Sequence, residues 1–234
     1  VGTFGFLRYS LPLTPEASQV LAPLVLVLAV IGVLYGSFQA FGQTDFKRFI
    51  AYVSIAHFGF IALGIFAFTS QAHAGSGSYM VNHSIATGML ILVIGMVITR
   101  GGSTRIADYG GMAKVTPLLA GTLLIAGLST LSLPGTNSFI SEFLVLIGSF
   151  ETRPVYTVLA TVGMVLAAVY VLWLYQRTMQ GPVRGDALLG AAAGAGAVTD
   201  PNGAGAHRLR IADLGAREIA VLTPLIVLII LLGF

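Results

Sequence analysis

Long apolar runs separated by short polar connections form the dominant pattern of this chain. Complete runs cover residues 18–41, 49–68, 79–99 and 154–175, and none of them contains Asp, Glu, Lys or Arg. A helix of about 20 residues is about 30 Å long, which is enough to cross a bilayer. The pattern therefore predicts an all-α integral membrane protein, folded as a polytopic bundle of transmembrane helices without strands.

The two ends of the chain look like parts of further helices. Residues 1–11 are predicted to end one membrane helix, which Pro12 stops, and residues 219–234 are predicted to begin another. Between these ends, residues 18–175 are predicted to form the transmembrane domain. We therefore expect the sequence to be part of a longer polypeptide.

The connections between the runs differ in composition. Residues 42–48 and 69–78 are predicted to be loops, because the first carries charges and the second is small and polar. Residues 176–218 are rich in Gly and Ala and are predicted to form a flexible linker. At the end of this linker, residues 208–218 are predicted to form an amphipathic helix on the membrane surface.

A broken apolar segment at about residues 115–150 is the most informative stretch. Pro134 and Gly135 interrupt it, and Glu142 follows seven residues later. Proline removes a backbone donor and clashes with the preceding turn, so a discontinuous helix is predicted. Interrupted backbone at membrane depth needs protein or water to satisfy it, and an ionisable residue there suggests a functional site. The plainer alternative is a proline kink beside a glutamate that bonds to a neighbouring helix.

The distribution of basic residues indicates how this segment crosses the membrane. If residues 115–150 cross once, only Arg8 and Arg153 lie on one side, whereas two crossings would divide the basic residues equally. The positive-inside bias favours one crossing and predicts that the basic loops are cytoplasmic. The residues on the predicted cytoplasmic side are Lys47, Arg48, Arg100, Arg105, Lys114, Arg177, Arg184, Arg208, Arg210 and Arg217.

Composition agrees with a membrane protein and excludes several other classes. Hydrophobic residues make up 56% of the chain and charged residues 9%, with a mean hydropathy of +0.91. The net charge of +3 includes no basic, aromatic-rich patch that would suggest nucleic-acid binding. The chain has no cysteine, which excludes disulfides and thiolate-bound clusters, and its histidines are too dispersed to predict a metal site.

Four motifs carry a resemblance to a known family. Residues 43–59, 82–88, 106–112 and 133–139 resemble, in that order, motifs of the antiporter-like subunits of proton-translocating membrane complexes. The chain is most similar to the subunit M family of bacterial NADH-quinone oxidoreductase, or respiratory complex I. That closer assignment depends mainly on Glu142, since the sister subunits generally carry lysine there.

The resemblance implies a fold and a function. It implies a protein of fourteen helices, of which this chain covers the end of the eighth to the fourteenth, with other proton-path residues lying upstream. It implies a proton-translocating subunit of a redox-driven NADH:quinone oxidoreductase in the bacterial inner membrane. No cofactor is expected on this chain; NADH, FMN, iron–sulfur clusters and quinone are expected on partner subunits. The expected partners are other membrane subunits, especially antiporter-like neighbours, and lipid.

Four titratable residues are the candidates for a proton path. Glu142 is the strongest candidate, because a buried carboxylate can gain or lose a proton when a neighbouring charge moves by a small distance. His57 and His83 lie inside predicted spans, and an imidazole can accept a proton on one nitrogen and release one from the other. Lys47 lies where a helix meets the membrane, so the alternative to a proton-path role is a side chain that snorkels to the membrane surface. For each histidine the alternative is a satisfied packing residue.

Polar residues at the break complete the candidate site. Thr136, Asn137 and Ser138 follow Pro134 and Gly135 and can satisfy the backbone groups that the break frees. They can equally be ordinary loop residues. The other histidines, His73 and His207, are predicted to lie in loops with surface roles.

Two other functions use the same sequence features. A subunit of a multisubunit sodium/proton antiporter would share the motifs. A membrane scaffold that conducts no ions would share the fold but tolerate apolar replacements of its buried charges.

Overall fold

The protein is a bundle of helices in the computed structural model, which describes residues 1–185 and 212–233. Within these described ranges, four helices are long and apolar enough to cross a membrane. These are α3 (Pro15–Phe41), α4 (Phe46–Ile65), α5 (Ser70–Gly101) and α8 (Pro154–Met179). The described part contains two isolated β-bridges and no strand.

Shorter elements complete the bundle. A continuous helical run at the N-terminus consists of α1 (Gly2–Gly5), the π-helical turn η1 (Phe6–Ser10) and α2 (Leu11–Leu13). The connection after α5 contains two 3₁₀ turns, η2 (Ile106–Asp108) and η3 (Met112–Lys114). The remaining helices are α6 (Pro117–Thr130), α7 (Asn137–Thr152) and α10 (Ala216–Leu231).

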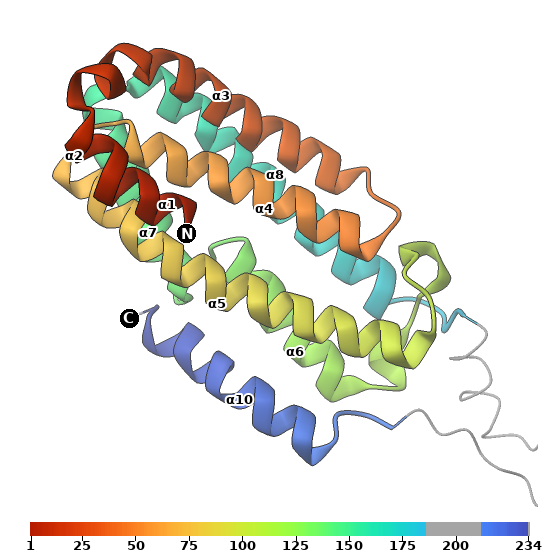
Figure 1. Ribbon diagram of the computed structural model, residues 1–234. Helices are drawn as coiled ribbons and strands as arrows, with labels where there is room; N and C mark the ends of the chain where they lie inside the picture. Colours follow the sequence, from red (N-terminus) through yellow and green to blue (C-terminus); the bar gives the residue numbers. More distant parts are fainter. Residues whose placement is uncertain (186–211, 234) are drawn as a thin grey trace, which may run out of the picture.

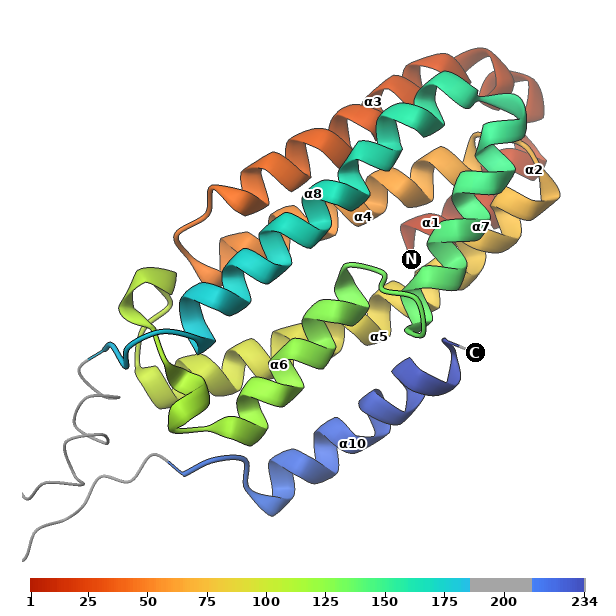
Figure 2. The same cartoon turned by 180° about the vertical axis from the view of Figure 1, so that it is seen from behind.

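The long helices pack in a simple order. Helix α3 lies against α4 and α8, and α5 lies against α4 on one side and against α6 and α7 on the other. Helix α10 runs beside α5 at the edge of the bundle, as both views show (Figures 1 and 2).

Helices α6 and α7 together make one crossing of the bundle. Backbone N–H groups at the start of α6 bond to Asp213, next to the end of α5, whereas Thr152 at the end of α7 bonds to Ala67 O, next to the start of α5. The two helices therefore follow the length of α5 in turn (Figure 2). The prediction of one interrupted crossing over residues 115–150 agrees with this arrangement.

The described basic residues divide between the two ends of the bundle. The end that holds the α3–α4 connection, the α5–α6 connection and the start of α10 is here called the basic end (Figure 1). Arg8 and Arg153 lie at the opposite end, while Arg208 and Arg210 lie outside the described residues. The basic residues near the basic end are Lys47, Arg48, Arg100, Arg105, Lys114, Arg177, Arg184 and Arg217.

Two apolar cores fill the bundle, one toward each end. The core toward the basic end includes Val53 and Met89, and the other includes Phe60 and Val145. Along α4, α5 and α6–α7, the stretch between the two cores carries polar side chains. We call this stretch the polar layer, and it consists of His57, Asn82, His83, Ser129, Thr130, Asn137, Ser138, Ser141 and Glu142.

The start of α5 corrects one sequence prediction. Residues 69–78 were expected to form a loop, but α5 begins at Ser70 and Thr69 caps it by accepting a hydrogen bond from Ala72 N at 3.1 Å. A Cβ at Gly75 would lie 2.7 Å from Val145 N, so the backbones of α5 and α7 are in close contact there. Small residues in this stretch serve helix packing rather than a turn, as they often do in membranes.

His73 is also placed differently from the prediction. It lies in α5 rather than in a loop, is half-buried, and its Nε2 is 2.8 Å from Ile65 O at the end of α4. His207 lies outside the described residues.

The predicted linker is only partly described. Its first residues, 176–179, belong to α8, and residues 186–211 lie outside the described part. Residues 212–215 are not helical, so an amphipathic helix does not occupy that portion of 208–218, and α10 begins at Ala216. Arg100 explains this: it donates hydrogen bonds to Ala212 O and Asp213 O and forms a salt bridge with Glu218 at 2.6 Å. These contacts hold the segment extended against the end of α5.

Candidate functional site

The helix break begins earlier than proline alone predicts. Helix α6 ends at Thr130, and Ser132 adopts a left-handed conformation with φ of 59°. Ser132 N donates to Ser129 O, and Leu133 N donates to Leu128 O at 3.0 Å. This pair of hydrogen bonds is the Schellman helix end, in which glycine usually occupies the left-handed position. A serine there carries some backbone strain, which often marks a functional site.

The polar residues after the break connect three helices. Asn137 accepts a hydrogen bond from Ser129 Oγ at 2.7 Å and donates one to Asn82 O at 3.1 Å. Asn82 in turn donates to Ser141 Oγ at 3.3 Å. Asn137 thus joins α6, α7 and α5 at the level of the break. Pro134 and Gly135 form the outer turn, where Gly135 has φ of 91°, and Thr136 bonds to Leu133 O.

The two histidines of the polar layer lie side by side. The ring centroids of His57 and His83 are 5.0 Å apart, and both residues are buried. His57 Nδ1 is 2.6 Å from the hydroxyl of Tyr79, and His83 Nδ1 is 3.1 Å from that of Thr87. His57 Nε2 makes no hydrogen bond to any described residue. A buried polar atom of this kind is a suitable site for an ordered water.

Glu142 lies close to the same group. Its side chain is buried, with 3% of the residue exposed. The hydroxyls of Tyr79 and Ser132 are near enough to interact with its carboxylate, although Ser132 Oγ makes no hydrogen bond of good geometry. Among residues 1–185 and 212–233, no basic side chain forms a salt bridge with Glu142. Its neighbours are therefore groups that can hydrogen-bond to either protonation state.

Tyr79 is the site residue that the sequence interpretation missed. Its hydroxyl lies between His57 and Glu142, and the residue is fully buried. Tyr79 precedes His83 by four residues, and such pairs share one face of a helix. That spacing was the available signal. It went unused because residues 69–78 were interpreted as a loop, which placed Tyr79 at the membrane surface.

Lys47 lies outside this group. It is exposed in the first turn of α4, ten residues before His57, a separation of about 15 Å along the helix axis. Asp45 caps this turn by accepting hydrogen bonds from Lys47 N at 2.8 Å and Arg48 N at 3.2 Å. A hydrogen bond from the Thr104 side chain, together with these two N–H groups, lowers the pKa of Asp45.

The described residues include no group of three His, Asp or Glu side chains that could hold a metal ion. The polar layer, together with the hydroxyl of Tyr79 at its edge, brings together groups that can exchange protons, namely two imidazoles, a phenol and a carboxylate. This series lies between two apolar cores, beside a break in a helix.

Comparison with known protein families shows which family the chain belongs to. The profile of the family described as "NADH:quinone oxidoreductase/Mrp antiporter, TM" matches residues 1–168. The chain belongs to this family. It is therefore a multi-pass membrane protein of the antiporter-like type, as its motifs and its four long apolar helices indicate.

Named relatives within the antiporter-like family point to one subunit. The chain is 48% identical over 233 residues to NADH-quinone oxidoreductase subunit M of Mycobacterium tuberculosis, covering 100% of this chain and 38% of the relative. It is 36% identical to NADH-ubiquinone oxidoreductase chain 4 of Marchantia polymorpha, covering 43% of that protein. The chain thus spans less than half of each relative. The resemblance to subunit M inferred from Glu142 agrees with these similarities.

Two solved structures share the fold of this chain. A chain in the structure titled "Respiratory complex I from Thermus thermophilus with bound NADH" matches with a TM-score of 0.85 and 30% identity, over 100% of this chain and 45% of that one. A chain in the Mrp complex from Dietzia sp. DQ12-45-1b matches with a TM-score of 0.75 at 20% identity, over 92% of this chain and 44% of that one, which is a likeness of fold.

Proposed function

We propose that this chain forms part of a proton-translocating membrane subunit of an NADH:quinone oxidoreductase. The observation that carries the proposal is the series His83, His57, Tyr79 and Glu142, which lies beside the helix break. Proton transfer needs groups that can both accept and donate within hydrogen-bonding reach, directly or through one water. The His57–Tyr79 contact of 2.6 Å meets this requirement directly.

The remaining steps of the proposed path need water. His57 and His83 are adjacent but share no direct hydrogen bond, and His57 Nε2 and Ser132 Oγ have no partner among the described residues. Ordered waters at these atoms would link the two imidazoles and the carboxylate. A discontinuous helix supports such a site because its freed backbone groups face a polar space, as they do in transporters.

Lys47 has a peripheral part in this proposal. Its exposed side chain at the basic end suits the exchange of protons with the aqueous side rather than with Glu142. The positive-inside bias makes that side cytoplasmic in a bacterial inner membrane. NADH, FMN, iron–sulfur clusters and quinone would be held by partner subunits, and neighbouring membrane subunits would be the direct partners of this chain.

The test is Glu142→Gln in the full-length protein within its native complex. Glutamine keeps the shape of the side chain but cannot carry a proton. We expect NADH:quinone turnover and proton uptake into sealed vesicles to fall together by at least about tenfold, because a positioned proton-transfer group contributes that much or more. Glu151→Gln is the matched control, since Glu151 lies in the same helix but is exposed.

The outcomes separate the competing functions. Unchanged turnover and pumping in Glu142→Gln would favour a scaffold that conducts no ions. The family profile also names Mrp antiporters, so a sodium/proton antiporter subunit is the second candidate. That candidate predicts sodium-dependent proton exchange without NADH oxidation and no NADH-oxidising subunits in the purified complex.

A further inference from the structure

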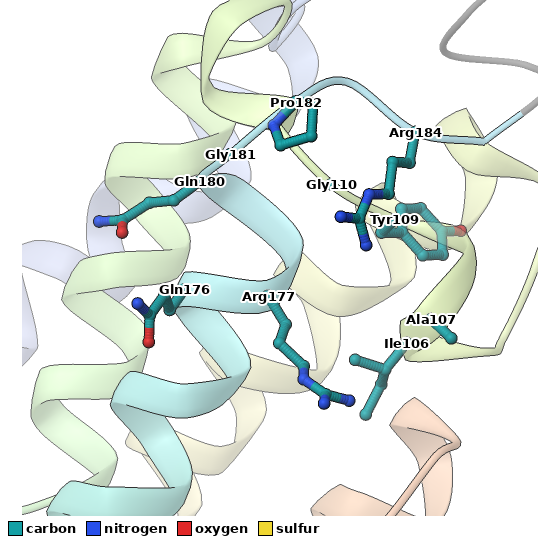
Figure 3. A pocket seen from close by; sticks show the side chains of 10 residues that line it. All are labelled: Ile106, Ala107, Tyr109, Gly110, Gln176, Arg177, Gln180, Gly181, Pro182 and Arg184. Carbon is teal, nitrogen blue, oxygen red and sulfur yellow. The ribbon is translucent and has the colours of Figure 1, made fainter.

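A polar pocket at the basic end lies apart from the proposed proton path. It has a volume of about 420 Å³ and lies between the end of α8 and the segment around η2. Its lining includes Ile106, Tyr109, Gln176, Arg177, Gln180 and Arg184 (Figure 3). None of these residues belongs to the polar layer, so the pocket needs an explanation of its own.

Two arginines give the pocket a positive charge. Figure 3 shows Arg184 beside Tyr109 and Arg177 reaching toward Ile106, so both side chains face the same wall. Neither arginine forms a salt bridge with a residue in the described ranges 1–185 and 212–233. The nearby Asp108 already accepts a hydrogen bond from Ser103 Oγ at 2.5 Å. The pocket therefore offers two guanidinium groups to an anion.

The pocket wall is fixed by backbone contacts. Arg184 N donates to Gly110 O at 3.1 Å, and Gly111 N donates to Gln180 O at 2.9 Å. Gly111 has φ of 62°, and a Cβ there would lie 2.7 Å from Val183 N. The close approach therefore needs glycine, and it holds Arg184 opposite η2.

The height of the pocket along the bundle matches a membrane surface. Trp173 lies one turn before Arg177 and packs against Phe41, with ring centroids 5.3 Å apart. Tryptophan is enriched at the level of lipid headgroups. The Arg177 guanidinium stacks at 4.3 Å from the centre of the Trp173 ring, which leaves its N–H edges available to an anion. Below this level, Leu172 and Val169 are exposed and apolar, as a surface for acyl chains must be.

From these observations we propose that the pocket binds the phosphate group of an acidic phospholipid, with Arg177 and Arg184 as the contacts to the headgroup. Arginine pairs well with phosphate because its planar N–H donors match the phosphate oxygens. Basic pockets between membrane helices on the cytoplasmic side favour anionic headgroups for the same reason. The adjacent apolar surface favours a lipid over a soluble phosphate.

The experiment compares lipids that differ only in headgroup. Dioleoyl phosphatidylglycerol and dioleoyl phosphatidylcholine are titrated into the purified full-length protein in detergent, and native mass spectrometry measures bound lipid. The double variant Arg177→Gln/Arg184→Gln is expected to bind phosphatidylglycerol about 25-fold more weakly, at about fivefold per basic residue. Its binding of phosphatidylcholine should be unchanged, which also checks that the variant is folded.

Two controls make the result decisive. Arg48→Gln removes an exposed charge from the same end outside the pocket, and its effect should stay within about twofold. An equal loss in Arg48→Gln would mean general charge attraction and would overturn the proposal. Equal affinity of the wild type for both lipids would also overturn it. Binding of inorganic phosphate that depends on the two arginines, without any preference between lipids, would reject the lipid as ligand.

Discussion

Helix α8 and the α6–α7 pair cross the same bundle side by side, but the polar side chains of the two crossings have different hydrogen-bond partners. Helix α8 is continuous over 26 residues, whereas α6 and α7 have 14 and 16 residues with a turn between them. In α8, the hydroxyl of Thr178 donates to Leu174 O one turn earlier, and the hydroxyl of Thr157 donates to Arg153 O at the N-cap of the helix. In the broken pair, Asn137 bonds to α6 and α5.

This difference shows how the helix break contributes to hydrogen bonding between helices. A continuous helix in lipid satisfies its own backbone, so it offers few polar groups to its neighbours. A break frees backbone groups and lets polar side chains bond between helices. These bonds join α7 to α5 and α6, so Glu142 in α7 comes close to Tyr79 in α5.

The largest effect is expected when α5, which packs along the broken pair, loses the hydroxyl of Tyr79. Tyr79→Phe removes the hydroxyl between His57 and Glu142, and coupled proton uptake in the intact complex should fall by about threefold to tenfold. The loss is smaller than for a positioned acid or base, because a water can replace part of a relay. Tyr109→Phe is the matched control, since Tyr109 is also buried but its hydroxyl donates to Ser103 O in the α5–α6 connection, at the basic end.

Similar losses in Tyr79→Phe and Tyr109→Phe would contradict a specific role for Tyr79, because both tyrosines would then act only through the stability of the bundle. Normal pumping in Tyr79→Phe would remove Tyr79 from the proposed path.

A smaller difference is expected in stability when each crossing loses one buried polar group. Asn137→Ala leaves Ser129 Oγ and Asn82 O without their partner, which should destabilise the protein by about 1–3 kcal/mol. Thr178→Val removes a bond to a carbonyl within α8 and should cost less than about 1 kcal/mol. Thermal unfolding of the purified full-length protein in detergent measures both changes. Equal shifts would show that the bonds between helices contribute no more than those within α8.

The smallest effect concerns the strained turn at the end of α6. Ser132→Gly should raise stability by about 1 kcal/mol, because glycine adopts the left-handed conformation without strain. Ser132→Ala keeps that strain and should give no gain. The same thermal assay compares the two variants, and proton uptake shows whether the Ser132 hydroxyl beside Glu142 contributes. A gain in both variants would mean that the backbone conformation is not the cause.

Much of this protein followed from the sequence alone. Apolar runs of membrane length, Pro134 and Gly135 in the middle of one run, and the uneven distribution of arginine and lysine predicted the helices, the break and the single crossing. These features depend on local physics: the length of a helix, the missing donor of proline and the energetic cost of charge in lipid. Glu142, His57 and His83 were recognisable for the same reason, since each is a titratable group inside an apolar run.

Only the tertiary structure decided which of these residues meet. It extended α5 through residues 70–78, because glycine and alanine there allow contact with α7. It placed Tyr79 between His57 and Glu142, left Lys47 about 15 Å along α4 from His57, and used Arg100 to fix the start of α10. A stretch of small residues has the same composition in a loop and in a closely packed helix, so composition alone does not distinguish them. A contact between segments that are distant in the sequence leaves no pattern in either segment. Such contacts are set by the packing of whole helices.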